Sequence, residues 1–165
     1  MIEQKIYNYL NLFFIALVAV WLGFSFSASI FPDNITVQLI TKYIYGQTCH
    51  QITERSFCID NKSMHICSRC FGIYFGLFTG LILFSLKKIF TLLDKQKYIG
   101  TSYILWLFII PFIIDIFLSK LSIYDSGNVI RFISGFLLLI PLSFLITSSL
   151  SDLSKEIIHR VYHAK

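Results

Sequence analysis

The chain has 165 residues, of which 56% are hydrophobic and 14% charged, and its formal net charge is +5. A mean hydropathy of +0.71 lies far above that of soluble domains, so the composition excludes a soluble protein and indicates an integral membrane protein. The positive charge is explained by membrane topology and attraction to anionic lipids, and nothing in its pattern indicates a nucleic-acid partner.

Four apolar stretches approach or exceed the roughly 20 residues that a helix needs to cross a bilayer. We expect them at about 10–31, 67–90, 99–119 and 129–150, with a Cys/His loop at 47–70 and a polar tail at 151–165. The predicted fold class is therefore all-α: a single polytopic membrane domain, a bundle of four transmembrane helices with a Cys/His-rich first outer loop.

Two segments next to these spans need a separate interpretation. Lys5 before the first apolar run is also typical of a signal peptide, but the run is long for one, so we expect a retained helix. Residues 32–48 mix polar and apolar side chains, which favours an interfacial amphipathic stretch over a fifth span. The polar tail is interpreted as a short amphipathic helix at the cytoplasmic lipid surface.

The lysines indicate the orientation of the chain. A compact cluster follows the second span and consists of Lys87, Lys88, Lys95 and Lys97. By the positive-inside rule, such a cluster lies in the cytoplasm. We therefore expect a multi-pass protein of the cell membrane with both termini cytoplasmic and the Cys/His loop outside.

All four cysteines lie in one short window that also holds two histidines. The spacing Cys67-x-x-Cys70 allows a tight turn to present two thiolates to one ion. We predict a site for zinc or another divalent transition metal, because Cys and His are the ligands such ions prefer. Its ligands would be Cys49, His50, Cys67 and Cys70, with Cys58 or His65 as the alternate fourth ligand.

Two other interpretations of the cysteines stay open. In a membrane thiol-disulfide oxidoreductase, linked to a quinone, Cys67 and Cys70 would alternate between dithiol and disulfide, with Arg69 lowering a thiol pKa. In a structural or assembly subunit that binds another membrane protein, two disulfides would close the loop. Whether the protein is an enzyme also stays open, because no metalloprotease, Ser-His-Asp or phosphate-loop motif is present.

Several ionisable residues are predicted to meet at the outer face. Arg55 and Arg69 lie in the Cys/His loop, Asp115 lies near the outer end of the third span, and Asn128 and Arg131 lie at the start of the fourth. Charged groups at this depth are usually paired or functional, so Asp115 is expected to pair with Arg131 or Arg69. The alternative is that Arg131 reaches the head groups and Asp115 caps a helix end.

The same polar residues also suggest what kind of ligand the site could bind. Arg55, Arg69, Asp115 and Arg131 are the candidates for any catalytic role, and with the ion they would form a polar pocket. Such a pocket could hold an anionic head group or a quinone oxygen.

Glycines recur every four residues in the second span, at Gly72, Gly76 and Gly80. This spacing places three positions without side chains on one helix face. Close packing against a neighbouring helix is the favoured interpretation, and room for a ligand is the alternative.

The same motifs resemble the signature of an uncharacterised family of multi-pass membrane proteins, the domain-of-unknown-function family 2085 (DUF2085). The matching residues are Cys49-His50-Gln51, Glu54-Arg55-Ser56, Cys67, Arg69, Cys70, Gly72, Tyr74, Gly76, Pro111, Asp115, Asn128, Arg131 and Gly135. The resemblance implies three motif cysteines, with Cys58 at a position where an aromatic or aliphatic residue is usual. Three thiols and a histidine suit a metal better than paired disulfides, and the resemblance implies no established activity.

Overall fold

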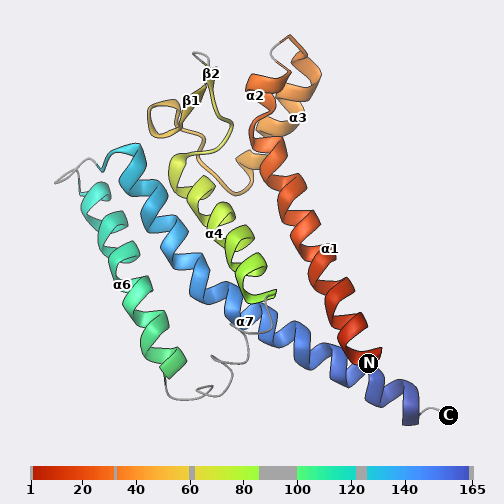
Figure 1. Cartoon of the computed structure of the whole chain (residues 1–165). Helices are drawn as coiled ribbons and strands as arrows, with labels where there is room; N and C mark the ends of the chain where they lie inside the picture. The colour runs from red at the N-terminus through yellow and green to blue at the C-terminus, as the bar shows by residue number, and fades with distance from the viewer. Residues whose placement is uncertain (1, 32, 60–61, 86–99, 122–125, 164–165) are drawn as a thin grey trace.

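The computed structural model describes residues 2–31, 33–59, 62–85, 100–121 and 126–163 (Figure 1). Long helices dominate it, and a two-stranded hairpin and a 3₁₀ turn lie in the loop between α3 and α4. In chain order the elements are α1 (Ile2–Ser25), α2 (Ser27–Ile30), α3 (Ile35–Gly46), the 3₁₀ turn η1 (Thr53–Arg55), β1 (Cys58–Ile59), β2 (Lys62–Ser63), α4 (Ser68–Ser85), α6 (Gly100–Lys120) and α7 (Asn128–His163).

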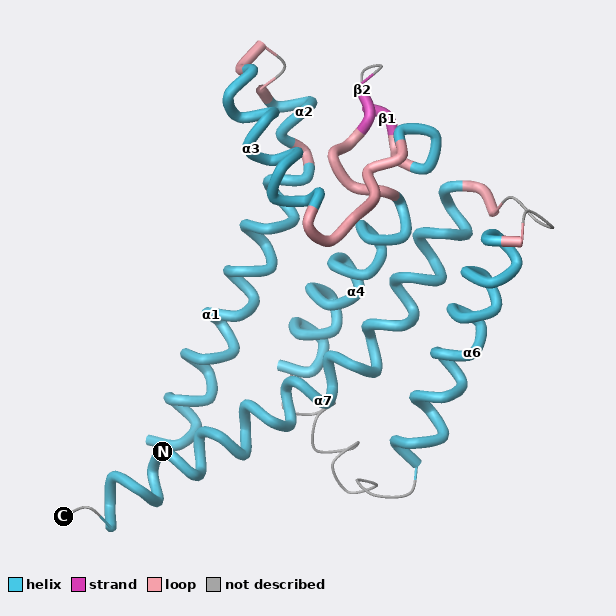
Figure 2. The backbone as a smooth tube through the Cα atoms, turned by 180° about the vertical axis from the view of Figure 1, so that it is seen from behind, coloured by secondary structure: helices cyan, strands magenta, loops and turns pink. Residues whose placement is uncertain are grey.

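The all-α prediction is confirmed apart from the hairpin, in which Cys58 pairs with Ser63 and Ile59 with Lys62. Within the described residues, three helices are long and apolar enough to cross a membrane, namely Gln4–Ser25, Ser68–Ser85 and Asn128–Arg160. Helix α6 occupies the predicted third span and contacts α7, which is also contacted by α1 and α4 (Figure 2).

The helix ends differ from the predicted limits in two places, and a third limit lies outside the described residues. Helix α1 begins near the start of the chain and ends at Ser25, where a turn leads into α2. The last residues of the predicted second span and the lysine cluster lie outside the described residues. Helix α7 continues without a break to His163, so the predicted polar tail is the far end of that helix. Pairs such as Arg160 with Glu156, four residues apart, support an exposed helix there.

Helices α4 and α7 pack with their backbones in close contact, as Figure 1 shows. An added Cβ at Gly72 or Gly76 would overlap the carbonyl oxygen of Phe132 or Phe136, respectively. Gly80 faces the Ser143 side chain in the same way. The glycine spacing therefore serves helix packing, and this contact sets the position of the first turn of α4 against α7.

We expect Gly76→Ala to destabilise the protein by about 1–3 kcal/mol, because overpacking forces well-packed backbones apart. Thermal unfolding in detergent, followed by circular dichroism, measures the effect. Gly23→Ala in α1 is the matched control, since an added Cβ there meets no heavy atom within 4 Å. Equal unfolding temperatures for the two variants would contradict the close α4–α7 contact.

The segment leading to the cysteines is anchored on α1. Helix α3 starts at a cap in which the Asn34 side chain accepts a hydrogen bond from the Val37 amide at 3.1 Å. Near its other end, the Tyr45 hydroxyl donates to the Trp21 carbonyl, and the two rings pack edge to face at 5.1 Å. Tyr45 also belongs to a buried cluster with Cys49. These contacts hold the end of α3 next to the start of α4.

Candidate metal centre and cationic pocket

Three thiols converge where the end of α3 meets the start of α4. Cys49 lies three residues beyond the end of α3, Cys67 precedes α4, and Cys70 lies in the first turn of α4. Their Sγ atoms all lie within 4.8 Å of one another. Cys49 is buried and the other two are partly buried. The cluster is therefore partly shielded from solvent.

Backbone amides point at two of the sulfurs. The amide of Cys67 donates to Cys49 Sγ at 3.2 Å, and that of Gln51 donates to the same sulfur at 3.5 Å. Backbone hydrogen bonds from Cys70 and Arg69 also help to lower the pKa of Cys67. Amide donors stabilise a thiolate, and the thiolate is the form that binds metal ions.

Gln51 produces part of this arrangement through its backbone. Its φ of 52° lies in the left-handed region, which a residue other than glycine adopts only when its surroundings hold it there. Its side-chain amide donates to the Lys42 carbonyl at 2.6 Å and so fixes the turn to α3. The turn brings the Gln51 amide back toward Cys49 Sγ.

The three thiols share charge unequally. Hydrogen bonds from the Cys49 and Cys70 thiols, supported by the backbone amides, lower the pKa of Cys67 to about 2. The hydrogen bond to Cys67 raises the pKa of Cys49, because that bond requires the Cys49 proton. These shifts favour the thiolate at Cys67, and a divalent cation would favour the loss of the protons of the other two thiols.

The other predicted ligands lie outside this group. Among the described residues, the cysteine triad is the set of Cys, His, Asp and Glu side chains whose ligand atoms converge. His50 is exposed and lines a pocket beside Cys67. Cys58 is exposed on β1. His65 lines a different pocket, where burial, with the charge of Lys42, lowers its pKa. Among the described residues, no side chain is therefore placed as the fourth ligand of an ion held by the triad.

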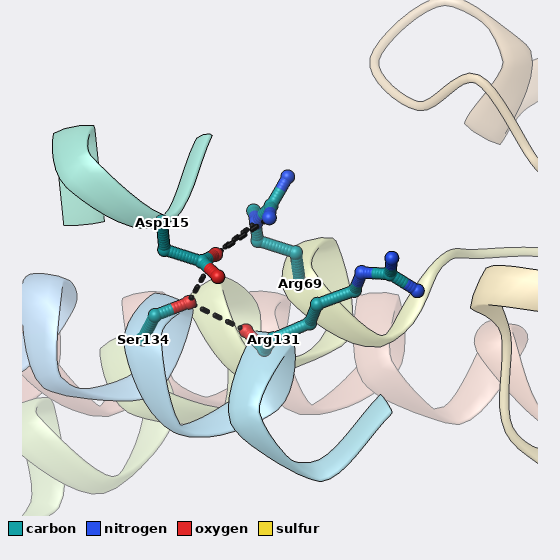
Figure 3. A network of polar contacts seen from close by, with 4 residues as sticks. All are labelled: Arg69, Asp115, Arg131 and Ser134. Atoms are coloured by element: carbon teal, nitrogen blue, oxygen red, sulfur yellow. Dashed lines mark hydrogen bonds and ion pairs between the residues drawn. The ribbon is translucent and has the colours of Figure 1, made fainter. Parts of the chain in front are cut away.

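Arg69, which lies between two of the triad cysteines in the sequence, forms an ion pair with Asp115 (Figure 3). Arg69, between Cys67 and Cys70 in the sequence, donates to Asp115 Oδ2 from Nη2 at 2.5 Å and from Nε at 3.1 Å. The Ser134 hydroxyl lies 3.2 Å from the same oxygen. The Asp115 side chain is only 9% exposed. The partner of Asp115 is thus Arg69, which links α6 to the first turn of α4.

Arg131 is buried in the first turn of α7, and its carbonyl accepts a hydrogen bond from Ser134 at 2.9 Å. Figure 3 shows its guanidinium directed away from the Arg69–Asp115 pair. Of the two pairings left open by the sequence, the one between Asp115 and Arg131 is not formed.

The loop that carries Arg55 is tied to the starts of two helices. The Ser68 hydroxyl of α4 donates to the Arg55 carbonyl at 3.0 Å. The Asn128 side chain of α7 donates to the Ser56 carbonyl at 3.1 Å. Arg55 is thereby held over the same end of the molecule as the ion pair.

A pocket of about 500 Å³ opens beside the triad. Its charged and ligand-type lining residues are His50, Arg55, Cys67, Arg69, Lys120 and Arg131. Lys120 was missed by sequence reasoning as a site residue. Its position as the last residue of α6, a helix that ends at this face, was the available signal.

These features define the class of the protein: it is a helical, multi-pass membrane protein with a cysteine triad at one end of its bundle. The chain belongs to the family described as predicted membrane protein (DUF2085), whose model matches residues 49–145. The matched region begins at the first cysteine of the triad and includes the whole ion pair. The family predicted from the sequence motifs is thus confirmed.

Two uncharacterised archaeal proteins are similar to part of the chain. The chain is 38% identical over 95 residues to an uncharacterised protein of Methanocaldococcus jannaschii, covering 57% of this chain and 58% of the relative. It is 35% identical over 88 residues to an uncharacterised protein of Methanothermobacter thermautotrophicus, covering 53% of this chain and 73% of the relative. The chain thus spans little more than half the length of the first relative. No solved structure matches the chain.

Proposed function

We propose that the protein is a membrane metalloprotein that binds zinc or another divalent transition metal through Cys49, Cys67 and Cys70. The observation that carries this proposal is the convergence of three Sγ atoms within 4.8 Å, with backbone amides directed at the sulfurs. A dithiol that served only to span a loop would not need a third thiol at the same point. Zn²⁺ favours thiolates in tetrahedral sites, and three sulfurs occupy three of its four positions.

His50 is proposed as the fourth ligand. It directly follows Cys49 in the chain and lines the pocket on which Cys67 borders. A Cys₃His set is typical of closed, structural zinc sites. In this role the ion would tie the loop after α3 to the start of α4, next to the pocket that Arg55, Arg69 and Arg131 line and near the Arg69–Asp115 ion pair.

The proposed topology has four spans, both termini in the cytoplasm and the metal centre outside. Support comes from three candidate spans and from α6, which contacts α7. The starts of α4 and α7 lie at one end of the bundle, and the start of α1 and the end of α7 lie toward the other (Figure 1). The lysines between the second and third spans favour the cytoplasm for the end that lacks the cysteines.

A redox function is the second candidate, because the three sulfurs are also close enough to exchange disulfide partners. The thiolate on Cys67 would be the attacking group in such an exchange, and its pKa is lowered by the hydrogen bonds from the neighbouring thiols. The oxidant would be a membrane quinone. Metal content and thiol state separate the two functions.

We expect detergent-purified protein to contain about one zinc per chain, with Cys49, Cys67 and Cys70 reduced, because thiolates that hold an ion are protected from oxidation. Plasma mass spectrometry gives the metal content. Titration of thiols in denaturant and chelator, with and without prior reductant, gives the thiol state. Metal-free protein whose thiols react only after reduction would overturn the metal proposal and favour the redox function.

A further inference from the structure

The cysteine triad offers an ion three ligand atoms of one kind. In the described part of the chain, the side chains whose ligand atoms converge are Cys49, Cys67 and Cys70, and their Sγ atoms lie within 4.8 Å of one another. Metal–sulfur bonds of about 2.3 Å place the sulfurs of a trigonal site roughly 4 Å apart, so shifts of less than about 1 Å produce that geometry. The folded chain therefore presents a three-sulfur site that is close to its bound form.

The proposed fourth ligand lies in a different environment. His50 is exposed and stands outside the converging group. Its ring has to turn toward the sulfurs before the site becomes tetrahedral. Zn²⁺ in structural sites is almost always four-coordinate, so zinc requires this rearrangement. An ion that is satisfied by three sulfurs binds without it.

The surroundings of the sulfurs are apolar. All three cysteines belong to or pack against one buried cluster, whose other buried members are Tyr45, Met64 and Ile66. Cys49 and Met64 are each 5% exposed, and Ile66 is fully buried. These neighbours supply no carboxylate oxygen for a hard cation, and the Met64 thioether is itself a soft group. The cluster therefore favours a soft ion bound by sulfur.

The number of converging sulfurs discriminates between the soft metal centres. Thiolates select Cu(I), zinc and iron–sulfur clusters. An iron–sulfur cluster is typically held by four cysteines, one more than converge in the described residues. Zinc also requires a fourth ligand. Cu(I) has a filled d shell and is stable in a trigonal set of thiolates, so it matches the triad as it stands.

We infer that the triad also binds a monovalent copper ion, Cu(I), through the sulfurs of Cys49, Cys67 and Cys70 and without His50. The inference rests on the proposed function for the triad as a metal site, and it adds a second ion that needs fewer ligands. Binding replaces thiol protons by the ion and transfers no electron. His50 then distinguishes the two metals, because zinc requires it and Cu(I) does not.

The test titrates each metal into the full chain in detergent, reduced, metal-free and under anaerobic conditions. Cu(I) is measured in competition with the chelator bicinchoninate, and Zn²⁺ against a colorimetric chelator. We expect His50→Ala to lower the zinc affinity at least about tenfold and to change the Cu(I) affinity less than about threefold, because only zinc loses a ligand. Cys70→Ser should lower the Cu(I) affinity roughly a hundredfold. Cys58→Ser is the matched control, since this exposed thiol lies outside the triad.

X-ray absorption at the copper edge counts the neighbours of the bound ion in the unmodified chain. Three sulfurs without nitrogen, together with a Cu(I) affinity that His50→Ala leaves intact, support the inference. A nitrogen neighbour, equal losses of both metals in His50→Ala, or Cu(I) binding that persists in Cys70→Ser overturns it. Zinc binding without Cu(I) binding refutes this inference and leaves the zinc proposal standing. Cu(I) binding without zinc binding refutes the zinc assignment alone.

Discussion

Cys67→Ser is expected to lower the affinity for Zn²⁺ by roughly a hundredfold or more. Structural zinc sites bind with about 10–16 kcal/mol over four ligands, so one ligand carries about 3 kcal/mol. Cys67 is one of the three converging sulfurs, and hydrogen bonds from its neighbours lower its pKa, which favours the thiolate that binds zinc. Competition with a colorimetric chelator, with plasma mass spectrometry on the purified variants, measures the loss.

Cys58→Ser is the matched control for this experiment. Cys58 lies in the same loop but is exposed on β1, outside the converging group. The control is expected to retain its metal, whereas Cys49→Ser and Cys70→Ser should behave like Cys67→Ser. Zinc lost equally from the Cys58 and Cys67 variants would show that the triad is not the binding site.

Asp115→Asn is expected to destabilise the folded protein by about 3 kcal/mol. The substitution preserves the shape of the side chain but leaves the guanidinium of Arg69, which is 19% exposed, without its carboxylate. Removing one partner of a buried ion pair typically costs about 3–5 kcal/mol, and the partial exposure of Arg69 places the value at the lower end. Thermal unfolding in detergent measures the effect.

Asp152→Asn provides the comparison for Asp115→Asn. Asp152 pairs with Lys155 near the end of α7, and both side chains are more than half exposed. Such surface pairs contribute about 0–1 kcal/mol. An Asp115 variant as stable as the Asp152 variant would show that the Arg69–Asp115 pair contributes nothing to stability.

The affinity for zinc is also expected to drop in the Asp115→Asn variant, by about 10–100-fold. Arg69 lies between two of the proposed ligands in the sequence, so the ion pair helps to orient them.

Local sequence patterns were sufficient for two of the three thiols. The Cys67-x-x-Cys70 spacing places two sulfurs on one turn whatever the rest of the chain does, whereas only the fold shows that Cys49 joins them and that Cys58 does not. The fourth ligand could not be predicted, since the positions of His50, Cys58 and His65 depend on how the loop folds over α4. A shift of one residue along that loop would turn a different side chain toward the sulfurs.

The partner of Asp115 likewise required the structure. Arg69 and Arg131 lie at the starts of two different helices, α4 and α7. Which one faces Asp115 depends on the rotation of each helix about its axis. That rotation is set by the close contact of Gly72 and Gly76 with the α7 backbone.

The sequence by itself determined the membrane class, the helical fold, the family and the residues from which a site is built. Those properties follow from composition, apolar run length and short spacings, all of which are local in the chain. Only the tertiary structure decided that three of the four cysteines converge, that Arg69 pairs with Asp115, and that Lys120 joins a cationic pocket. These features depend on the register and rotation of packed helices, and such long-range contacts leave no signal in any single stretch of sequence.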